Sequence, residues 1–215
     1  MRPRIILVTL FILFGFTAAF ATPQIPDVLV YEGKEYPIHG GFLSDYFKRF
    51  PERNPKSDDE SCSALWQGFR ATFGEDKGRI YLNDIEINVC FGTPTSGLKK
   101  AVPNGERLYI DWVSDLCVSA YGKNDEDPYS IESREAYEKY SLFEIDKGRV
   151  VEVRHFDNKG YRLFKKKQFD AYKATKDYDG ELKAMLERNP TMSKSDADWN
   201  IEFSIFSRTK RFLIK

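Results

Sequence analysis

The chain has 215 residues, with 33 lysines and arginines against 33 aspartates and glutamates, so its formal net charge is zero. This balance supplies no global positive field, which argues against binding to nucleic acid or to an anionic membrane surface. Aromatic residues make up 15% of the chain, enough bulky apolar surface for a substantial core, which argues against general disorder.

Residues 1–21 have the three parts of a secretory signal peptide. Two arginines precede a short apolar run that ends in Ala19-Phe20-Ala21, the A-x-A cleavage pattern. The run is shorter than the about 20 apolar residues of a membrane-spanning helix. We therefore expect an exported, periplasmic or extracellular protein that starts near Thr22, with no transmembrane segment after cleavage. Cleavage would leave 31 basic residues against 33 acidic ones, and residues 22–215 fit a single domain.

The mature chain begins with a predicted hairpin, in which Glu32-Gly33 joins two short strands. Residues 42–50 then place their apolar side chains on one face of a short helix, which Pro51 ends. The polar, proline-bearing stretch that follows predicts an exposed loop.

Residues 63–153 predict one strand after another. Ile80 and Leu82 alternate in one phase and the apolar residues from Ile85 onward in the other, so a bulge or tight turn is expected at Asn83-Asp84. The segments R-L-Y-I-D-W and L-C-V-S-A-Y-G predict one hairpin, and Y-S-L-F-E-I and V-V-E-V-R-H-F predict another. The motif F-x-x-D-K-G-R occurs twice, at Phe73 and Phe143, which we interpret as repeated turn chemistry.

After Phe164 the composition changes to helix formers, and Gly180 is expected to divide the segment into two helices that end at Asn189-Pro190. Ile201, Phe203 and Ile205 alternate, so the chain is expected to return to the sheet. The sequence as a whole predicts an α+β fold: a mostly antiparallel meandering β-sheet with a short N-terminal helix and a helical segment before the C-terminal strands.

Three cysteines lie in the mature chain: Cys62, Cys90 and Cys117. An oxidising compartment permits a disulfide, and an odd number leaves at least one thiol over. Cys90 and Cys117 both stand in strand-like segments, so a Cys90–Cys117 disulfide is the preferred pairing; three buried thiols are the alternative.

Motifs that bind cofactors or metals are missing. Residues 92–100, G-T-P-T-S-G-L-K-K, resemble a P-loop, but Leu98 holds the place of the lysine that would reach the phosphates. The two histidines, His39 and His155, stand apart, without zinc-site spacing. We therefore expect no cofactor and no metal site.

Residue patterns typical of catalytic sites are also scarce in the sequence. Cys117 could act with His155, or Cys62 with His39, if the fold brought the two side chains together. A thiol in an apolar strand, however, is normally inert. The acidic run Asp58-Asp59-Glu60 lacks the spacing of a calcium-binding loop, and we interpret it as a solvated cluster in a loop.

Two further features could mark a contact surface. The basic run Lys165-Lys166-Lys167 could face an acidic partner, although interleaved aspartates favour a solvated helix face. The tryptophans Trp66, Trp112 and Trp199 would contact a sugar or a protein if they were exposed; the burial tendency of aromatics favours the core. Trp66 and Trp112 are the candidate contact residues.

The stretches Y-E-G-K-E-Y-P-I, A-L-W-Q-G-F-R-A-T-F and D-K-G-R-I-Y-L-N-D-I, with L-Y-I-D-W-V-S-D-L, resemble a family of uncharacterised exported proteins of Gram-negative bacteria. The resemblance covers roughly residues 31–153. It implies a periplasmic or surface location and no particular activity.

Two functional hypotheses follow. The first is a non-enzymatic protein-binding module of the envelope, of inhibitor or immunity type, whose partner is an envelope protein. The second is a small extracytoplasmic hydrolase that uses carboxylates or a Cys/His pair. Because no catalytic signature stands in the sequence, the first is preferred.

Overall fold

The computed structural model describes residues 23–56, 62–90, 92–124 and 135–215. They form an α+β structure around one mixed, mostly antiparallel sheet, as the sequence predicts. The expected signal peptide and Asp58-Asp59-Glu60 lie outside the described residues. Within the described ranges, none of the helices combines the length and the apolar character that a membrane crossing needs.

Within the described residues, the sheet contains nine strands. They are β1 (Asp27–Tyr31), β2 (Lys34–Ile38), β3 (Arg70–Asp76), β4 (Arg79–Ile87), β5 (Thr95–Ser96), β6 (Leu108–Tyr109), β7 (Asp115–Asn124), β8 (Tyr137–Asp146) and β9 (Arg149–Asp157). The helices are α2 (Ser44–Arg49), the 3-10 turn η1 (Pro51–Arg53), α3 (Leu98–Ala101), α4 (Asn158–Lys173), α5 (Lys176–Arg188), α6 (Lys194–Phe203) and α7 (Ile205–Thr209).

The strand order is β2-β1-β3-β4-β9-β8-β7, and the short strands β5 and β6 also pair with β4. Only the β1–β3 pairing is parallel among the pairings described. The contact between β4 and β9 is confined to one register pair, Arg79 with Arg149. The sheet therefore consists of two halves, β1–β6 and β7–β9, that meet at a narrow seam.

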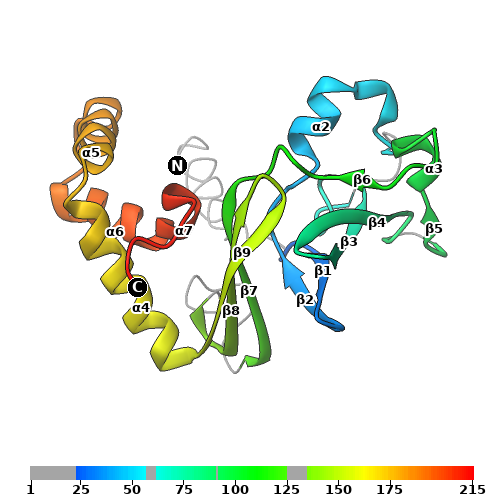
Figure 1. Cartoon of the computed structure of the whole chain (residues 1–215). Helices are drawn as coiled ribbons and strands as arrows, with labels where there is room; N and C mark the ends of the chain where they lie inside the picture. The colour runs from blue at the N-terminus through cyan, green and yellow to red at the C-terminus, as the bar shows by residue number, and fades with distance from the viewer. Residues whose placement is uncertain (1–22, 57–61, 91, 125–134) are drawn as a thin grey trace, which may run out of the picture.

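Two hydrophobic cores lie on the two faces of β7–β9. The first core lies between the two halves of the sheet and α2, and its fully buried members include Leu29, Phe73 and Phe143. The second lies between the outer face of β7–β8 and the C-terminal helices, around Tyr140, Leu142 and Ile201. Figure 1 shows this arrangement, with α4–α7 on one side of β7–β9 and β1–β6 with α2 and α3 on the other.

Several local predictions are confirmed. The β1–β2 and β8–β9 hairpins form, and α2 ends just before Pro51. Asn83 is the extra residue of a bulge, because Thr72 pairs with Asp84 and the next residue, Phe73, pairs with Leu82. The predicted hairpin between residues 107–112 and 116–122 is wrong: β6 pairs with β4, whereas β7 pairs with β8.

The prediction of strands at the C-terminus is wrong. Residues 194–203 and 205–209 are helical, as α6 and α7, and Ala197, Ile201 and Ile205 are all fully buried. Their spacing of four residues puts them on one helix face, so the apparent alternation was part of a helical period. Ser193 and Asp196 start α6 with a capping box.

The break between the two preceding helices also differs from its prediction. Gly180 lies inside α5, and the chain turns at Thr175 instead. The Thr175 hydroxyl accepts a hydrogen bond from the backbone amide of Tyr178 at 3.3 Å and so caps the N-terminus of α5.

Candidate functional site

A disulfide joins Cys62 to Cys90, with a Cα–Cα distance of 6.4 Å. This corrects the predicted Cys90–Cys117 pairing. Cys90 does not belong to a strand, because β4 ends at Ile87 and the chain turns away after it, whereas Cys117 lies near the start of β7 with its side chain in the first core. The cross-link fixes the start of the loop of residues 62–69 to the chain just beyond β4. We call residues 62–69 the Trp66 loop.

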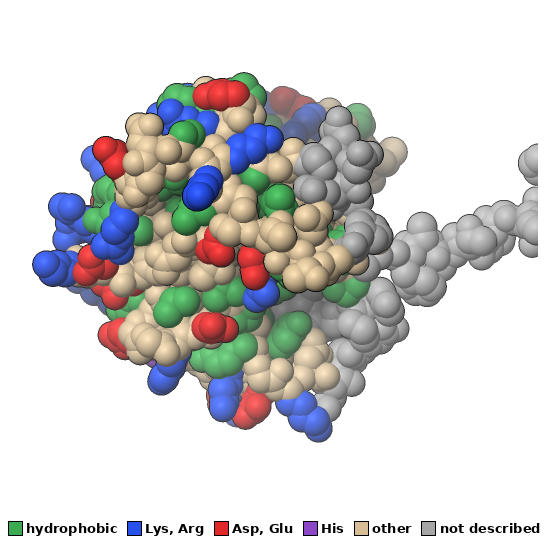
Figure 2. All heavy atoms as spheres, turned by 90° about the vertical axis from the view of Figure 1, so that its right-hand side faces the viewer, with side chains coloured by type: hydrophobic (Ala, Val, Ile, Leu, Met, Phe, Trp, Pro, Cys, Tyr) green, Lys and Arg blue, Asp and Glu red, His purple; other side chains and the backbone are tan. Residues whose placement is uncertain are grey.

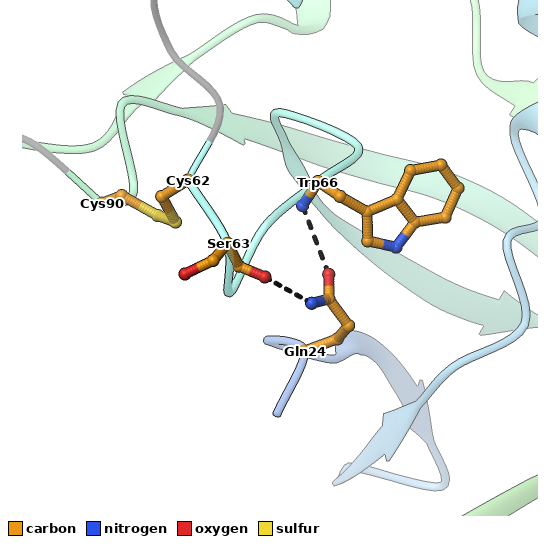
Figure 3. The surroundings of a disulfide bond; sticks show 5 residues. All are labelled: Gln24, Cys62, Ser63, Trp66 and Cys90. Atoms are coloured by element: carbon orange, nitrogen blue, oxygen red, sulfur yellow. Dashed lines mark hydrogen bonds between the residues drawn. A yellow bond between two sulfur atoms is a disulfide. The ribbon is translucent and has the colours of Figure 1, made fainter. Parts of the chain in front are cut away.

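The Trp66 loop is also held by the residues that precede β1. Gln24 Nε2 donates to the carbonyl of Ser63 at 2.6 Å, and Gln24 Oε1 accepts from the amide of Trp66 at 3.2 Å. The amide of Ile25 donates to the carbonyl of Ala64 at 2.7 Å. Figure 3 shows the disulfide on one side of the loop and the Gln24 clamp on the other, with the Trp66 indole pointing away from both.

Trp66 is 69% exposed, the highest value among the large hydrophobic residues of the described ranges. It borders a hollow of about 170 Å³. The hollow is lined by Gln24, Ile25, Asp27, Ile38, His39, Gly41, Leu65, Trp66 and Gln67. A large apolar ring therefore stands beside a mixed polar and apolar depression, on a loop that is cross-linked and hydrogen-bonded.

Asp27 is the buried acid of this hollow and is only 5% exposed. Its Oδ1 accepts hydrogen bonds from the amide of Ala71 at 2.8 Å and from Gln67 Nε2 at 3.0 Å. Burial raises the pKa of Asp27 to about 6, against the opposing effect of these hydrogen bonds and of Arg70. Asp27 thus ties β1 to β3 and orients Gln67, which is a positioning role.

The other two tryptophans have different surroundings. Trp112 is half-buried: its indole nitrogen donates to the carbonyl of Phe42 at 2.8 Å, and its ring stacks on Tyr46. Trp112 therefore packs against the first core and lacks the exposed ring that a contact surface needs. Trp199 is 53% exposed on α6 and stacks on Phe203. Of the two candidate contact residues, Trp66 alone presents its indole to solvent.

His155 belongs to a row of polar side chains across three strands. Its Nδ1 is 2.8 Å from the hydroxyl of Ser141, which in turn lies 3.0 Å from the hydroxyl of Tyr121. His155 and Tyr121 line a shallow hollow of about 340 Å³ at the surface, but Ser141 is fully buried. A hydroxyl that no substrate can reach does not act as a nucleophile, so this row is a structural hydrogen-bond network.

The predicted Cys/His pairs do not form among the described residues. Cys62 is consumed by the disulfide, so it has no thiol to pair with His39. Cys117 is buried, and burial raises the pKa of its thiol far above neutrality, whereas His155 bonds to Ser141. Nor do the described residues contain a group of three or more histidines, cysteines or carboxylates able to hold a metal ion.

The charges on the face of the β1–β6 half show no dominant sign (Figure 2). In Figure 2, which views the β1–β6 half, basic and acidic side chains are interspersed. The basic run on α4 is divided, because Lys165 is buried and forms an ion pair with Glu135, whereas Lys166 and Lys167 are exposed. Residues 92–100, which resemble a P-loop, contain β5 and the first three residues of the four-residue helix α3.

Sequence reasoning missed the residues that support Trp66. Gln24, Asp27 and Gln67 carry no motif, and their roles depend on bringing residues 24–27 against residues 63–71 through a parallel strand pairing. The only local signal was the W-Q-G-F stretch itself. The comparisons add no constraint: no protein-family model, no curated protein and no solved structure matches this chain.

Proposed function

We propose that the chain is an exported envelope protein that acts as a non-enzymatic protein-binding module, of inhibitor or immunity type, and that Trp66 is its principal contact residue. The observation that carries the proposal is the exposure of the Trp66 indole on a braced loop. Tryptophan is enriched among the residues that dominate the binding energy of protein interfaces.

The bracing of the loop supports this function. A contact residue on a mobile loop loses conformational entropy when it binds, and that loss weakens the complex. The Cys62–Cys90 disulfide and the two hydrogen bonds of Gln24 order the Trp66 backbone before any partner arrives. The structure thus keeps a large apolar side chain in water and holds its backbone in place.

The size of the neighbouring hollow favours a macromolecular partner over a small substrate. Small-molecule sites usually enclose about 300–1,000 Å³, whereas the hollow beside Trp66 has about 170 Å³. It can receive one side chain of a partner while the Trp66 ring covers the adjacent surface.

The hydrolase hypothesis has weaker support. Asp27 is the only carboxylate that lines the Trp66 hollow among the described residues, whereas acid–base glycoside hydrolysis, for example, needs two. The thiol of Cys117 is buried in the core. The larger hollow beside His155 contains Glu138 and Asp157, and it is where a carboxylate-dependent activity would have to reside.

Affinity capture tests the proposed function. Residues 22–215 are immobilised as the wild type and as Trp66→Ala, and an envelope extract of the source organism is passed over both. The expected result is one stoichiometric, salt-resistant partner protein that the wild type retains and the variant loses. An empty wild-type column, or equal retention by both proteins, would overturn the proposal.

Export is a separate part of the proposal and rests on the sequence of residues 1–21. Intact-mass analysis of the protein purified from the envelope should give a mature chain that begins at Thr22. A chain that keeps its first 21 residues would contradict processed export.

A further inference from the structure

The two D-K-G-R motifs form neighbouring turns at the seam of the sheet. Lys77-Gly78 and Lys147-Gly148 are the central residues of the β3–β4 and β8–β9 hairpins, and all four have positive φ. The amide of Ile80 donates to the carbonyl of Gly148 at 2.8 Å, and the amide of Val150 donates to the carbonyl of Gly78 at 2.9 Å. These two bonds flank Arg79 and Arg149 and place them directly opposite each other.

Arg79 and Arg149 form a non-hydrogen-bonded pair, the kind in which opposite residues lie closest, with Cα atoms about 4.5 Å apart. Both side chains are exposed on the same face of the sheet. Like charges directly opposite each other destabilise a sheet. The fold therefore maintains an unfavourable juxtaposition at the only ladder contact described between its two halves.

Neither of the nearby carboxylates forms an ion pair with Arg79 or Arg149. Asp76 is opposite Arg79 in its hairpin, but its Oδ2 binds Arg107 at 2.7 Å. Asp146 is opposite Arg149, but its Oδ1 accepts from the hydroxyl of Ser114 at 3.1 Å. Within the described ranges, no carboxylate lies within ion-pair distance of Arg79 or Arg149.

The backbone beneath the two arginines is fixed. The Tyr109 hydroxyl donates to the carbonyl of Lys147, and the Arg79 guanidinium lies over the Tyr109 ring, 5.5 Å from its centroid. Gly148 is buried against the carbonyl of Ile110. The two guanidinium groups therefore extend from a rigid platform, which lowers the cost of holding them together around a ligand.

We propose that Arg79 and Arg149 together bind a phosphate group. A guanidinium offers a planar fork that pairs with two oxygens, so two forks are matched better by an oxyanion with more than two oxygens than by a carboxylate. Inorganic phosphate supplies four oxygens and a phosphomonoester three terminal ones, and the dianion of either carries the two negative charges that balance the pair. The ligand is free phosphate or a phosphomonoester headgroup. The site lies at the opposite end of the β3–β4 hairpin from Trp66, so it is independent of the proposed protein contact.

Thermal unfolding and calorimetric titration with inorganic phosphate, at an ionic strength matched with chloride, test the site. The melting temperature of the wild type should rise with phosphate concentration and reach a plateau. Arg149→Gln should weaken the apparent affinity for phosphate by about tenfold. In chloride alone Arg149→Gln should melt at or above the wild-type temperature, because it removes the like-charge contact. Arg149→Lys keeps the charge without the fork, and it should weaken phosphate binding too.

Arg188→Gln is the control, because Arg188 is exposed on α5, far along the chain from the seam. It should leave the phosphate response unchanged. Co-sedimentation with phosphatidylcholine vesicles that contain phosphatidate or phosphatidylglycerol distinguishes the two sources of phosphate. Binding to the phosphatidate vesicles alone identifies a phosphomonoester headgroup. A response to inorganic phosphate without vesicle binding identifies free phosphate. The proposal is overturned if wild type and Arg149→Gln respond equally, if Arg149→Lys keeps full affinity, or if neither phosphate source binds.

Discussion

Asp27 Oδ1 accepts a hydrogen bond from the backbone amide of Ala71 at 2.8 Å, so the first residue of β1 is anchored to β3 by a buried carboxyl. Burial outweighs this bond and raises the pKa of Asp27 from 3.8 to about 6. The folded state therefore binds the Asp27 proton more tightly than the unfolded state does. The contribution of Asp27 to the free energy of unfolding is full below pH 3.8 and is lost as the pH rises through about 6.

Asp27→Asn should remove this pH dependence. The variant keeps an oxygen that can accept from Ala71 and Gln67, and it never pays the desolvation of a charge. The free energy of unfolding of the variant, minus that of the wild type, should rise by up to about 3 kcal/mol between pH 4 and pH 7 and stay constant at higher pH. Urea unfolding across this range measures the difference, and parallel pH profiles for the two proteins would contradict the assignment.

The cysteines give a prediction about thiol reactivity. Without a reductant, no thiol of the folded protein should react with an alkylating reagent, because two cysteines are bonded and Cys117 is buried. After denaturation without a reductant, Cys117 alone should be labelled, which peptide mass spectrometry resolves. Labelling of Cys62 in the denatured, unreduced protein would disprove the Cys62–Cys90 pairing.

Removal of the disulfide should also destabilise the protein. The two cysteines are separated by 28 positions, and a loop of that size corresponds to about 3–4 kcal/mol in the chain-entropy model. The double variant Cys62→Ser/Cys90→Ser should lose that amount in denaturant unfolding. Cys117→Ser leaves the cross-link intact and is the control for the loss of a sulfur atom. Equal free energies of unfolding for the double variant and the wild type would contradict the estimate.

The two repeated turns provide a matched pair of glycine substitutions. Gly78 and Gly148 occupy the same turn position with φ of 79° and 70°. A Cβ on Gly78 would meet no atom within 4 Å, but a Cβ on Gly148 would lie 2.6 Å from the carbonyl oxygen of Ile110. Gly78→Ala should therefore cost about 1–2 kcal/mol from backbone conformation alone, and Gly148→Ala should cost clearly more. Equal losses in urea unfolding would show that the packing of the β8–β9 turn against residues 109–110 is not rigid.

Gln168 on α4 holds the C-terminal residues, and its side chain is fully buried. Its Nε2 donates to the Thr209 hydroxyl at 3.0 Å and the Arg211 carbonyl at 2.8 Å, and its Oε1 accepts from the amide of Leu213 at 3.0 Å. Gln168→Leu leaves these groups without the amide and should cost about 2–3 kcal/mol. Hydrogen exchange of the Leu213 amide should accelerate. Lys167→Ala, at the exposed neighbouring position, should change neither quantity.

The sequence predicted best the elements whose signals are local. The β1–β2 turn, the Asn83 bulge and the β8–β9 hairpin follow from alternation and turn residues within short windows. Pairings between strands that lie far apart in the sequence were not predicted. The parallel contact of β1 with β3 and the contact of β4 with β9 depend on the packing of the whole first core, which no local pattern specifies.

The errors have the same origin. Ile201, Phe203 and Ile205 fit a strand period over five residues, but the capping box at Ser193 and the earlier Ala197 show the helical period over a longer window. The disulfide partner of Cys90 was misassigned because the end of β4 could not be located within a few residues. At the candidate site, the sequence named Trp66 as a candidate contact residue but favoured a place for it in the core, which its exposure contradicts. The hydrogen bonds of Gln24 were not predicted, since that contact spans about forty positions of the chain.

The most direct test of the account is the affinity of the captured partner for Trp66→Ala and Trp199→Ala, measured side by side with the wild type. Both tryptophans are exposed, at 69% and 53%, so the two variants remove similar apolar surface at different places. Trp66→Ala should raise the dissociation constant by at least about thirtyfold, as for an interface hot spot, whereas Trp199→Ala should stay within about twofold of the wild type. Equal effects of the two substitutions, or a larger effect of Trp199→Ala, would contradict Trp66 as the principal contact.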